Sequence, residues 1–156
     1  MAVFNAAQAL EMAQQIEKNG EAYYNAVAAK QTAPDVKALF EDLAAQERIH
    51  YRVFTEMLGA VGPAPELPVA EYDQYDAYLK VALDNALFAG PDKALALASQ
   101  AQDAQTAVRA ALGFEKDTLL FFYDLREMVA AKDREAVTRI INEEKTHVRR
   151  LARMLA

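Results

Sequence analysis

The sequence predicts an all-α fold, and three observations support that prediction. Apolar residues make up 53% of the chain, yet it holds only five glycines and five prolines. The alternation of β-branched or aromatic residues with polar ones that is typical of strands is absent. Apolar residues instead recur at steps of three and four in four long segments, which places them on one stripe of a helix. With 156 residues the chain is long enough to bury a core, so we expect residues 1–156 to form a single bundle.

The first predicted helix covers about residues 6–30, because Asn5 is a favourable N-cap and the apolar stripe begins soon after it. A turn around Pro34 should end it, since proline disfavours helix at the residue before it. The second helix is expected over about 35–58. The glycine- and proline-rich stretch that starts at Gly59 should not continue it.

Residues 59–102 are expected to form a long crossover connection that contains short helices. The spacing of apolar residues between Tyr72 and Leu87 suggests one helix that ends near Gly90, and residues 92–101 suggest a second. This insert could carry the chain back across the bundle, or its apolar face could cover a partner subunit. The sequence is compatible with both arrangements.

The third and fourth long helices are expected over about 103–132 and 134–156. Each of the four long segments has one glutamate in the middle of its apolar stripe, where a charged residue is unfavourable in a core. The second and fourth also have a histidine three positions after the glutamate, and residues three apart lie side by side on a helix. The six polar members of the stripes are Glu17, Glu47, His50, Glu115, Glu144 and His147.

An internal repeat supports this assignment. The triplet around Glu17 reads Ile-Glu-Lys and the triplet around Glu115 reads Phe-Glu-Lys, and an aromatic pair follows each of them. The second glutamate of each half comes 30 residues later in the first half and 29 in the second. The chain therefore resembles two copies of a helical hairpin related by an approximate two-fold axis. That symmetry would bring the six polar residues to one level of the bundle.

Four carboxylates that converge in an apolar core would repel one another and lose hydration, which is costly unless cations compensate them. A glutamate from each of two helices and a Glu-x-x-His pair from each of the other two is the ligand set of di-iron and di-manganese bundles. Two ferrous ions would balance the four glutamates. Oxygen-rich ligation with one imidazole per metal suits iron or manganese, and zinc could replace them as an inert substitute. We expect Glu17, Glu47 and His50 to serve mainly one metal, the other three residues to serve the second, and two glutamates to bridge.

These motifs resemble those of the rubrerythrin group of the ferritin-like superfamily. The resemblance rests on four segments: Glu17 with Tyr24 seven positions later, Glu47-Arg-Ile-His50, Glu115-Lys-Asp-Thr118 and Glu144-Lys-Thr-His147. It implies a ferritin-like four-helix bundle with a long crossover between the second and third helices. It also implies two iron ions in a non-haem centre that reacts with hydrogen peroxide or dioxygen, usually as a peroxide reductase.

Two features depart from the classical members of that group. The chain has no cysteine and hence no rubredoxin domain, so electrons would have to come from an external donor, a rubredoxin- or flavoprotein-like protein. Thr118 stands where those members have a further carboxylate, and Gly20 holds the related place in the first half. We therefore expect each iron to stay on its own histidine, without the redox-linked movement known in the group's peroxidases.

Tyr24 is the candidate catalytic residue outside the ligand set, because a hydroxyl one or two turns from the site could bond a ligand carboxylate. Tyr23, Phe121 and Phe122 are expected to be core residues. Glu21 and Glu143 flank the stripes and are expected to be exposed.

The net charge of −6 argues against a nucleic-acid partner, and no apolar run approaches the 18 residues of a membrane span. The N-terminus lacks the basic start of a signal peptide and the chain has no cysteine, so a cytoplasmic location is expected. A homodimer is expected as well. Two rival functions use the same ligands. One is iron oxidation and sequestration, as in ferritins, which requires a cage, and the other is a bundle that binds metal only for stability.

Overall fold

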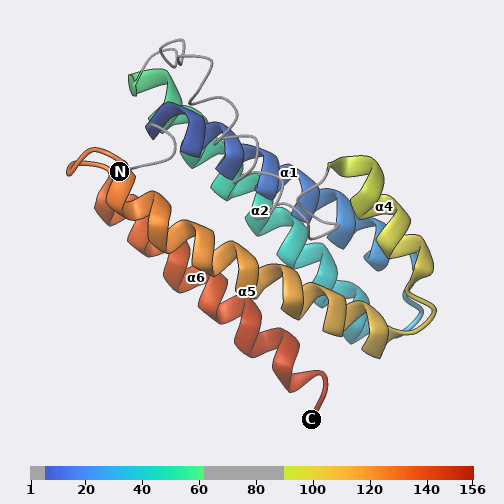
Figure 1. The fold of residues 1–156 in the computed structure, drawn as a ribbon. Helices are drawn as coiled ribbons and strands as arrows, with labels where there is room; N and C mark the ends of the chain where they lie inside the picture. Colours follow the sequence, from blue (N-terminus) through green and yellow to red (C-terminus); the bar gives the residue numbers. More distant parts are fainter. Residues whose placement is uncertain (1–5, 62–89) are drawn as a thin grey trace.

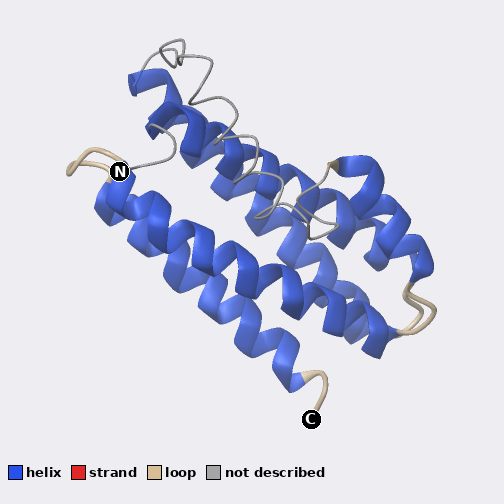
Figure 2. Ribbon diagram, viewed as in Figure 1, coloured by secondary structure: helices blue, strands red, loops and turns tan. Residues whose placement is uncertain are grey.

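The structure is a computed structural model that describes residues 6–61 and 90–156. These residues form five α-helices and loops, with no strand in the described ranges (Figure 2), which confirms the all-α prediction. No described helix is long and apolar enough to cross a membrane. The helices are α1 (Ala6–Lys30), α2 (Pro34–Val61), α4 (Pro91–Gln100), α5 (Ala104–Met128) and α6 (Arg134–Arg153).

The four long helices form a bundle of two hairpins (Figure 1). Helix α1 packs most extensively on α2, and α5 packs on α6, while α1–α5 and α2–α6 contacts join the hairpins. The short helix α4 lies against α1 and leads into α5. The predicted four-helix bundle with a helix in the crossover is therefore confirmed.

The helix boundaries follow the sequence prediction except at three ends. Helix α2 continues to Val61, three residues past the predicted end, because an isolated glycine such as Gly59 costs only about 1 kcal/mol in a helix. Helix α5 ends at Met128 rather than near residue 132, since Val129 turns to extended backbone and keeps its side chain buried. Helix α6 ends at Arg153, and the next two residues form a turn.

The other local features of the crossover match the chemistry of their residues. The short helix predicted over 92–101 is α4, whereas the helix suggested between Tyr72 and Leu87 lies outside the described residues. Gly90 precedes α4 with φ of 121°, a region that only glycine adopts readily. Asp103 caps α5, because its carboxylate accepts a hydrogen bond of 2.7 Å from the backbone N–H of Thr106.

Apolar layers fill the bundle on both sides of one polar layer. Among the residues that the structure describes, six aromatic side chains are almost completely buried, and several pack ring against ring, as in the 5.2 Å centroid distance between Phe54 and Phe122. This packing fixes the rotation of each helix, so the polar members of the four stripes must face one another. The six aromatics are Tyr23, Tyr24, Phe40, Phe54, Phe114 and Phe122.

Candidate metal centre

The structure brings together all six polar residues selected from the sequence. Each long helix contributes one glutamate at the centre of the bundle, and α2 and α6 each add a histidine one turn later. All six side chains are at most 1% exposed. The helical spacing that placed them on the apolar stripes thus also places them in one buried volume.

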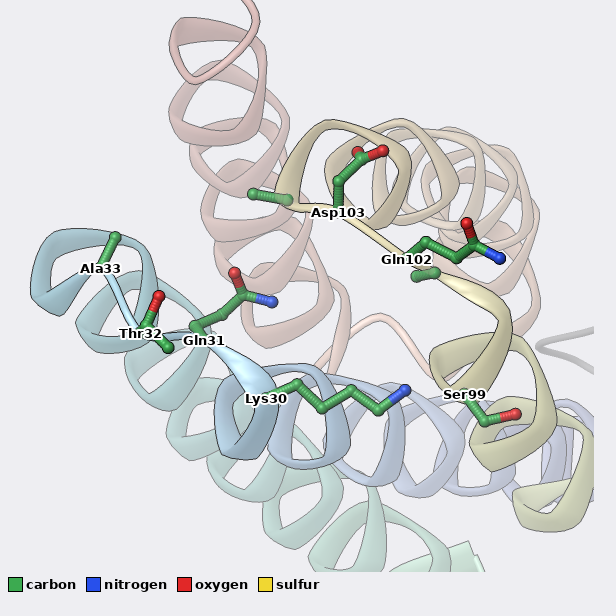
Figure 3. A pocket seen from close by; sticks show the side chains of 9 residues that line it. Lys30, Gln31, Thr32, Ala33, Ser99, Gln102 and Asp103 are labelled. Carbon is green, nitrogen blue, oxygen red and sulfur yellow. The ribbon is translucent and has the colours of Figure 1, made fainter.

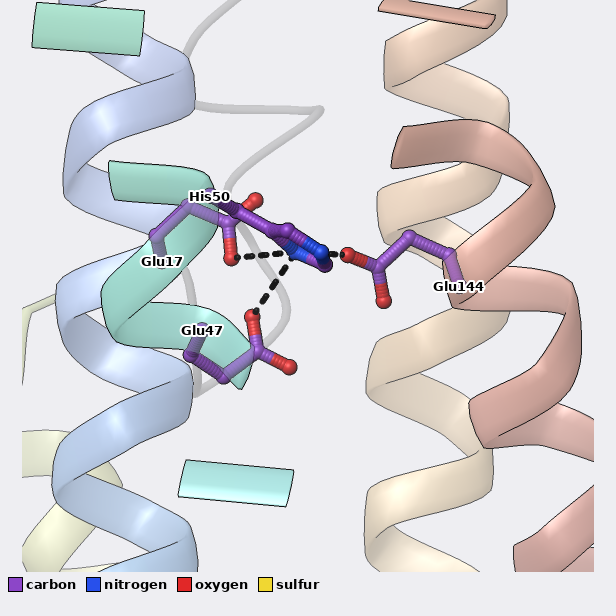
Figure 4. Close-up of side chains that lie close together, drawn as sticks. All are labelled: Glu17, Glu47, His50 and Glu144. Atoms are coloured by element: carbon purple, nitrogen blue, oxygen red, sulfur yellow. Dashed lines mark ion pairs between the residues drawn. The ribbon is translucent and has the colours of Figure 1, made fainter. Parts of the chain in front are cut away.

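His50 lies among three glutamates that come from three helices (Figure 4). Its Nδ1 atom is 3.6 Å from Glu17 Oε2, 4.0 Å from Glu47 Oε2 and 2.7 Å from Glu144 Oε1. The glutamate nearest to His50 therefore belongs to the other hairpin. Glu17, Glu47 and His50 thus lie together, as expected for one metal, and Glu144 reaches across the bundle as a bridging glutamate would.

His147 occupies the matching position in the second hairpin. Its Nδ1 atom is 3.4 Å from Glu47 Oε1, 3.3 Å from Glu115 Oε1 and 2.8 Å from Glu144 Oε2. The donor atoms thus form two groups, Glu17–Glu47–His50–Glu144 and Glu47–Glu115–Glu144–His147, within each of which they lie within 4.8 Å of one another. Glu47 and Glu144 belong to both groups and offer one oxygen to each, as bridging carboxylates do.

Burial and mutual repulsion perturb the ionisation of these groups in the metal-free protein. Burial, together with the charge of Glu144, raises the pKa of Glu115 to about 8, and burial raises the pKa values of Glu17 and Glu47 as well. Burial alone would also raise the pKa of Glu144, but the imidazole of His147 holds it below its ordinary value. Without cations, the layer therefore needs protons to balance its negative charge.

Eight of the carboxylate oxygens and imidazole nitrogens of these six residues are buried and make no hydrogen bond. They include both oxygens of Glu17, both oxygens of Glu144 and the Nδ1 atoms of the two histidines. The Nδ1 atoms lie at ion-pair distance from carboxylates but lack hydrogen-bond geometry. Buried polar atoms are rarely left unpaired, so this concentration indicates a missing partner. Four carboxylates and two imidazoles fit a pair of divalent cations in number, charge and chemical type.

A hydrogen-bond partner orients each histidine from outside the layer. His50 Nε2 lies 2.7 Å from Glu143 Oε2, and His147 Nε2 lies 2.7 Å from Gln46 Oε1. Since a carboxylate or amide oxygen only accepts, each Nε2 carries the hydrogen and each Nδ1 faces the glutamates. Both Nδ1 atoms are therefore positioned to be the metal ligands.

The helical pattern of the sequence indicates no role for Gln46 and predicts only that Glu143 is exposed. Glu143 is indeed half-exposed at its side chain, but its oxygen contacts the buried ring of His50. A signal was present: each of these residues directly precedes a ligand glutamate, at matching positions of the two repeats. Glu21 is only partly exposed, because it pairs with Arg48 at 2.7 Å.

Tyr24 is buried beside the layer and donates a short hydrogen bond from its hydroxyl to Glu115 Oε1. Burial and the neighbouring Glu115 raise the pKa of Tyr24 well above its ordinary value, so the hydroxyl keeps its proton. Tyr23 instead donates to the backbone oxygen of Ala107, at 2.8 Å, as expected for a core residue. Phe122, the counterpart of Tyr24 in the repeat, has no hydroxyl.

The two positions that depart from the classical pattern are both close to the ligands. Thr118 is buried, and its hydroxyl makes no hydrogen bond. At Gly20 there is no room for a side chain: a Cβ atom there would lie 3.0 Å from the ring of Phe114 and 3.3 Å from the carboxylate carbon of Glu47. Glycine is needed at this point because the side chain of Glu47 and the ring of Phe114 approach α1 closely.

Two pockets on the surface of the bundle differ in whether they reach the six buried residues. One of about 560 Å³ lies where the α1–α2 turn meets the α4–α5 turn, is lined by Lys30, Gln31 and Asp103 among others, and contains none of the six residues (Figure 3). A second, of about 150 Å³, lies between α2 and α6 and is lined in part by His50 and Glu143.

Comparisons with known proteins agree with this geometry. The family model for rubrerythrin matches residues 8–155. The structure is similar to that of a Thermotoga maritima protein described as a candidate ferritin-like diiron-carboxylate protein, with a TM-score of 0.65, 23% identity, and coverage of 96% of this chain and 93% of that chain. No curated protein is significantly similar in sequence. The match over nearly the whole chain shows that the protein belongs to the rubrerythrin family.

Proposed function

We propose that this protein reduces hydrogen peroxide at a di-iron centre, with electrons from a separate donor protein. The single observation that carries the proposal is the layer of buried, unpaired donor atoms from Glu17, Glu47, His50, Glu115, Glu144 and His147. Membership of the rubrerythrin family makes iron the first choice of metal, with manganese or zinc as substitutes.

The reaction consumes one peroxide, two electrons and two protons and forms two water molecules. When bound, a ferrous pair supplies the two electrons, one from each ion. The chain supplies the ligands, and its apolar layers on either side limit the access of water. Tyr24 is proposed to act through Glu115, since its hydrogen bond fixes one carboxylate oxygen and leaves the other free.

The proposed electron donor is external, because the sequence contains no cysteine with which to bind a rubredoxin-type iron. A rubredoxin- or flavoprotein-like donor would have to approach the surface of the bundle. Dioxygen is the alternative oxidant, and it would require four electrons for complete reduction to water.

Reaction of the anaerobic, iron-loaded protein with peroxide tests the proposal. We expect two irons per chain by metal analysis, oxidation of two ferrous ions per peroxide in stopped-flow absorbance, and steady turnover when a reductase and rubredoxin are supplied. A protein that binds two irons but leaves peroxide unreduced would contradict the proposal and indicate a metal that serves stability only.

Assembly size separates the proposed function from iron storage. We propose a homodimer, and light scattering of the iron-loaded protein should give a mass near twice 17.3 kDa. A closed assembly of many subunits that accumulates iron far beyond two ions per chain would favour ferritin-type sequestration instead.

A further inference from the structure

The two histidines are covered differently where they approach the surface between α2 and α6. Above His147, Gln46 donates from Nε2 to Asp42 Oδ2 at 2.8 Å, and Arg150 donates from α6 to the same oxygen at 2.6 Å. These three side chains form a connected network that joins the two helices across His147. The ring itself bonds the inner end of the network, at Gln46 Oε1.

On the side of His50 that approaches the surface, the positions equivalent to Gln46, Asp42 and Arg150 carry different residues. A shift of 97 positions, the one that relates His50 to His147, pairs Gln46 with Glu143, Asp42 with Arg139 and Val53 with Arg150. Valine is too short to span the two helices as Arg150 does. The pocket of about 150 Å³ lies at this point, with Val53, Arg139, Glu143 and His50 in its lining.

Glu143 connects this pocket to the ligand layer. Its side chain is 52% exposed, yet its Oε2 atom is 2.7 Å from the ring of His50, which is 1% exposed. The carboxylate can therefore contact a hydrated cation in the pocket and a metal ligand at the same time. Arg139 also lines this pocket and carries a positive charge that would repel an entering cation.

We propose that divalent cations enter the centre through the pocket beside His50, with Glu143 as the entry ligand, while the network of Gln46, Asp42 and Arg150 closes the His147 end. This inference rests on the proposed two-metal site and adds the route by which it fills. A carboxylate at the pocket raises the local concentration of cations, and on the far side of the His50 ring the Nδ1 atom faces the glutamates and offers the next ligand.

The rate at which metal-free protein takes up Co²⁺, followed by the visible absorbance of the bound ion in a stopped-flow instrument, tests the route. Val53→Arg should fill the pocket as Arg150 fills the other end, and it should slow uptake by about tenfold or more. Glu143→Gln keeps an acceptor for His50 but removes the charge, and should slow uptake by about threefold or more, with a weaker dependence on salt.

Arg150→Val is the matched control, because it opens the other end and leaves the pocket beside His50 intact. Its uptake should be at least as fast as that of the wild type. Equilibrium metal analysis should give two Co²⁺ per chain for the wild type and all variants, which separates the route from the site. Val53→Met fills the same pocket without a charge and replaces Val53→Arg if circular dichroism shows that the latter is unfolded.

The proposed route would be wrong if a folded pocket-filling variant and Glu143→Gln both took up Co²⁺ as fast as the wild type. Slower uptake in Arg150→Val than in the pocket-filling variant would overturn it too, since entry would then depend on the His147 end. A wild-type protein that never binds two ions would overturn the two-metal site itself.

Discussion

The two hairpins carry the same proposed ligands in different surroundings. Each provides two glutamates and one histidine at matching positions of the repeat. Around them, Tyr24 is matched by Phe122, Gln46 by Glu143 and Arg150 by Val53. The repeat thus fixes where a metal pair can bind, whereas the neighbours that differ determine how each half is oriented, covered and reached.

The largest expected effects are on metal occupancy, and they distinguish the glutamates that face both metal positions from those that face only one. Glu47 and Glu144 face both histidines, so Glu47→Ala or Glu144→Ala should lower metal occupancy from two ions to fewer than one per chain. Glu17→Ala and Glu115→Ala each change one half and should leave about one ion bound. Metal analysis after dialysis measures this. Equal losses in all four variants would contradict the shared roles.

Removal of the metals should destabilise both halves together, because four buried carboxylates then lack their cations. The metal-free protein should lose several kcal/mol of unfolding free energy at neutral pH, roughly 3–5 kcal/mol by analogy with broken buried ion pairs. Replacement of all four glutamates by leucine should give a chain that folds without metal and is more stable than the metal-free wild type. Denaturant titrations test both statements. Equal stabilities of metal-free and metal-loaded wild type would refute the first, and a leucine variant less stable than the metal-free wild type would refute the second.

Gly20 and Thr118 occupy equivalent positions, but Thr118 already has a side chain there, whereas a Cβ atom at Gly20 would meet Phe114 and Glu47. Thr118→Glu should fold and supply a seventh ligand, so that crystals of the oxidised and reduced variant differ in the position of one iron. The wild type should keep each iron on its own histidine, within about 1 Å between the two states. Gly20→Glu should lose stability and metal, since the added atoms meet Phe114 and Glu47. Wild-type metal content in Gly20→Glu would show that the first half has room after all.

Loss of the Tyr24 hydroxyl should have a smaller effect that is confined to one half. Tyr24→Phe removes the bond to Glu115 and should cost about 1–3 kcal/mol of stability, the usual range for a buried acceptor left unpaired. It should also slow the reaction with peroxide while two irons remain bound. Tyr23→Phe is the matched control, because it removes a buried hydroxyl that donates to the backbone oxygen of Ala107 and not to one of the four glutamates. An unchanged peroxide rate in Tyr24→Phe would remove Tyr24 from the proposed mechanism.

The smallest effect is expected at the surface pair that joins α1 and α2. Arg48 lies 2.7 Å from Glu21, and its side chain is half-exposed, so Arg48→Ala should cost less than about 1 kcal/mol. The equivalent position in the second hairpin is Lys145, which lies over the ring of Tyr123 instead of beside an acid. Thermal melts at low and high salt should show that salt weakens only the contribution of Arg48 to stability.

The fold and the convergence of the six polar side chains could be predicted because both follow from helical periodicity. A glutamate at mid-stripe must face the core wherever its helix packs, so Glu17, Glu47, Glu115 and Glu144 needed no knowledge of the other helices. The early end of α5 could not be predicted, because it depends on the burial of Val129 against the rest of the bundle.

The position of the outer partners beside the glutamates is visible in the sequence, but their contacts with the histidines could not be predicted, for a related reason. Glu143 and Gln46 lie beside the apolar stripes, where most polar residues are solvated. Whether they contact His50 and His147 depends on the rotation and offset of α2 against α6, which no local pattern encodes. The same holds for the network of Asp42 and Arg150, which joins residues 108 positions apart.

The division of the bundle into two hairpins has a mechanical consequence. Packing is extensive within each hairpin, whereas α2 and α6 touch over a small area and share two glutamates that each face both histidines. A bound metal pair would therefore act as a covalent-like cross-link between the hairpins, in a chain with no cysteine to form a disulfide. Loading with iron would then tie the two halves of the chain into one cooperative unit of unfolding.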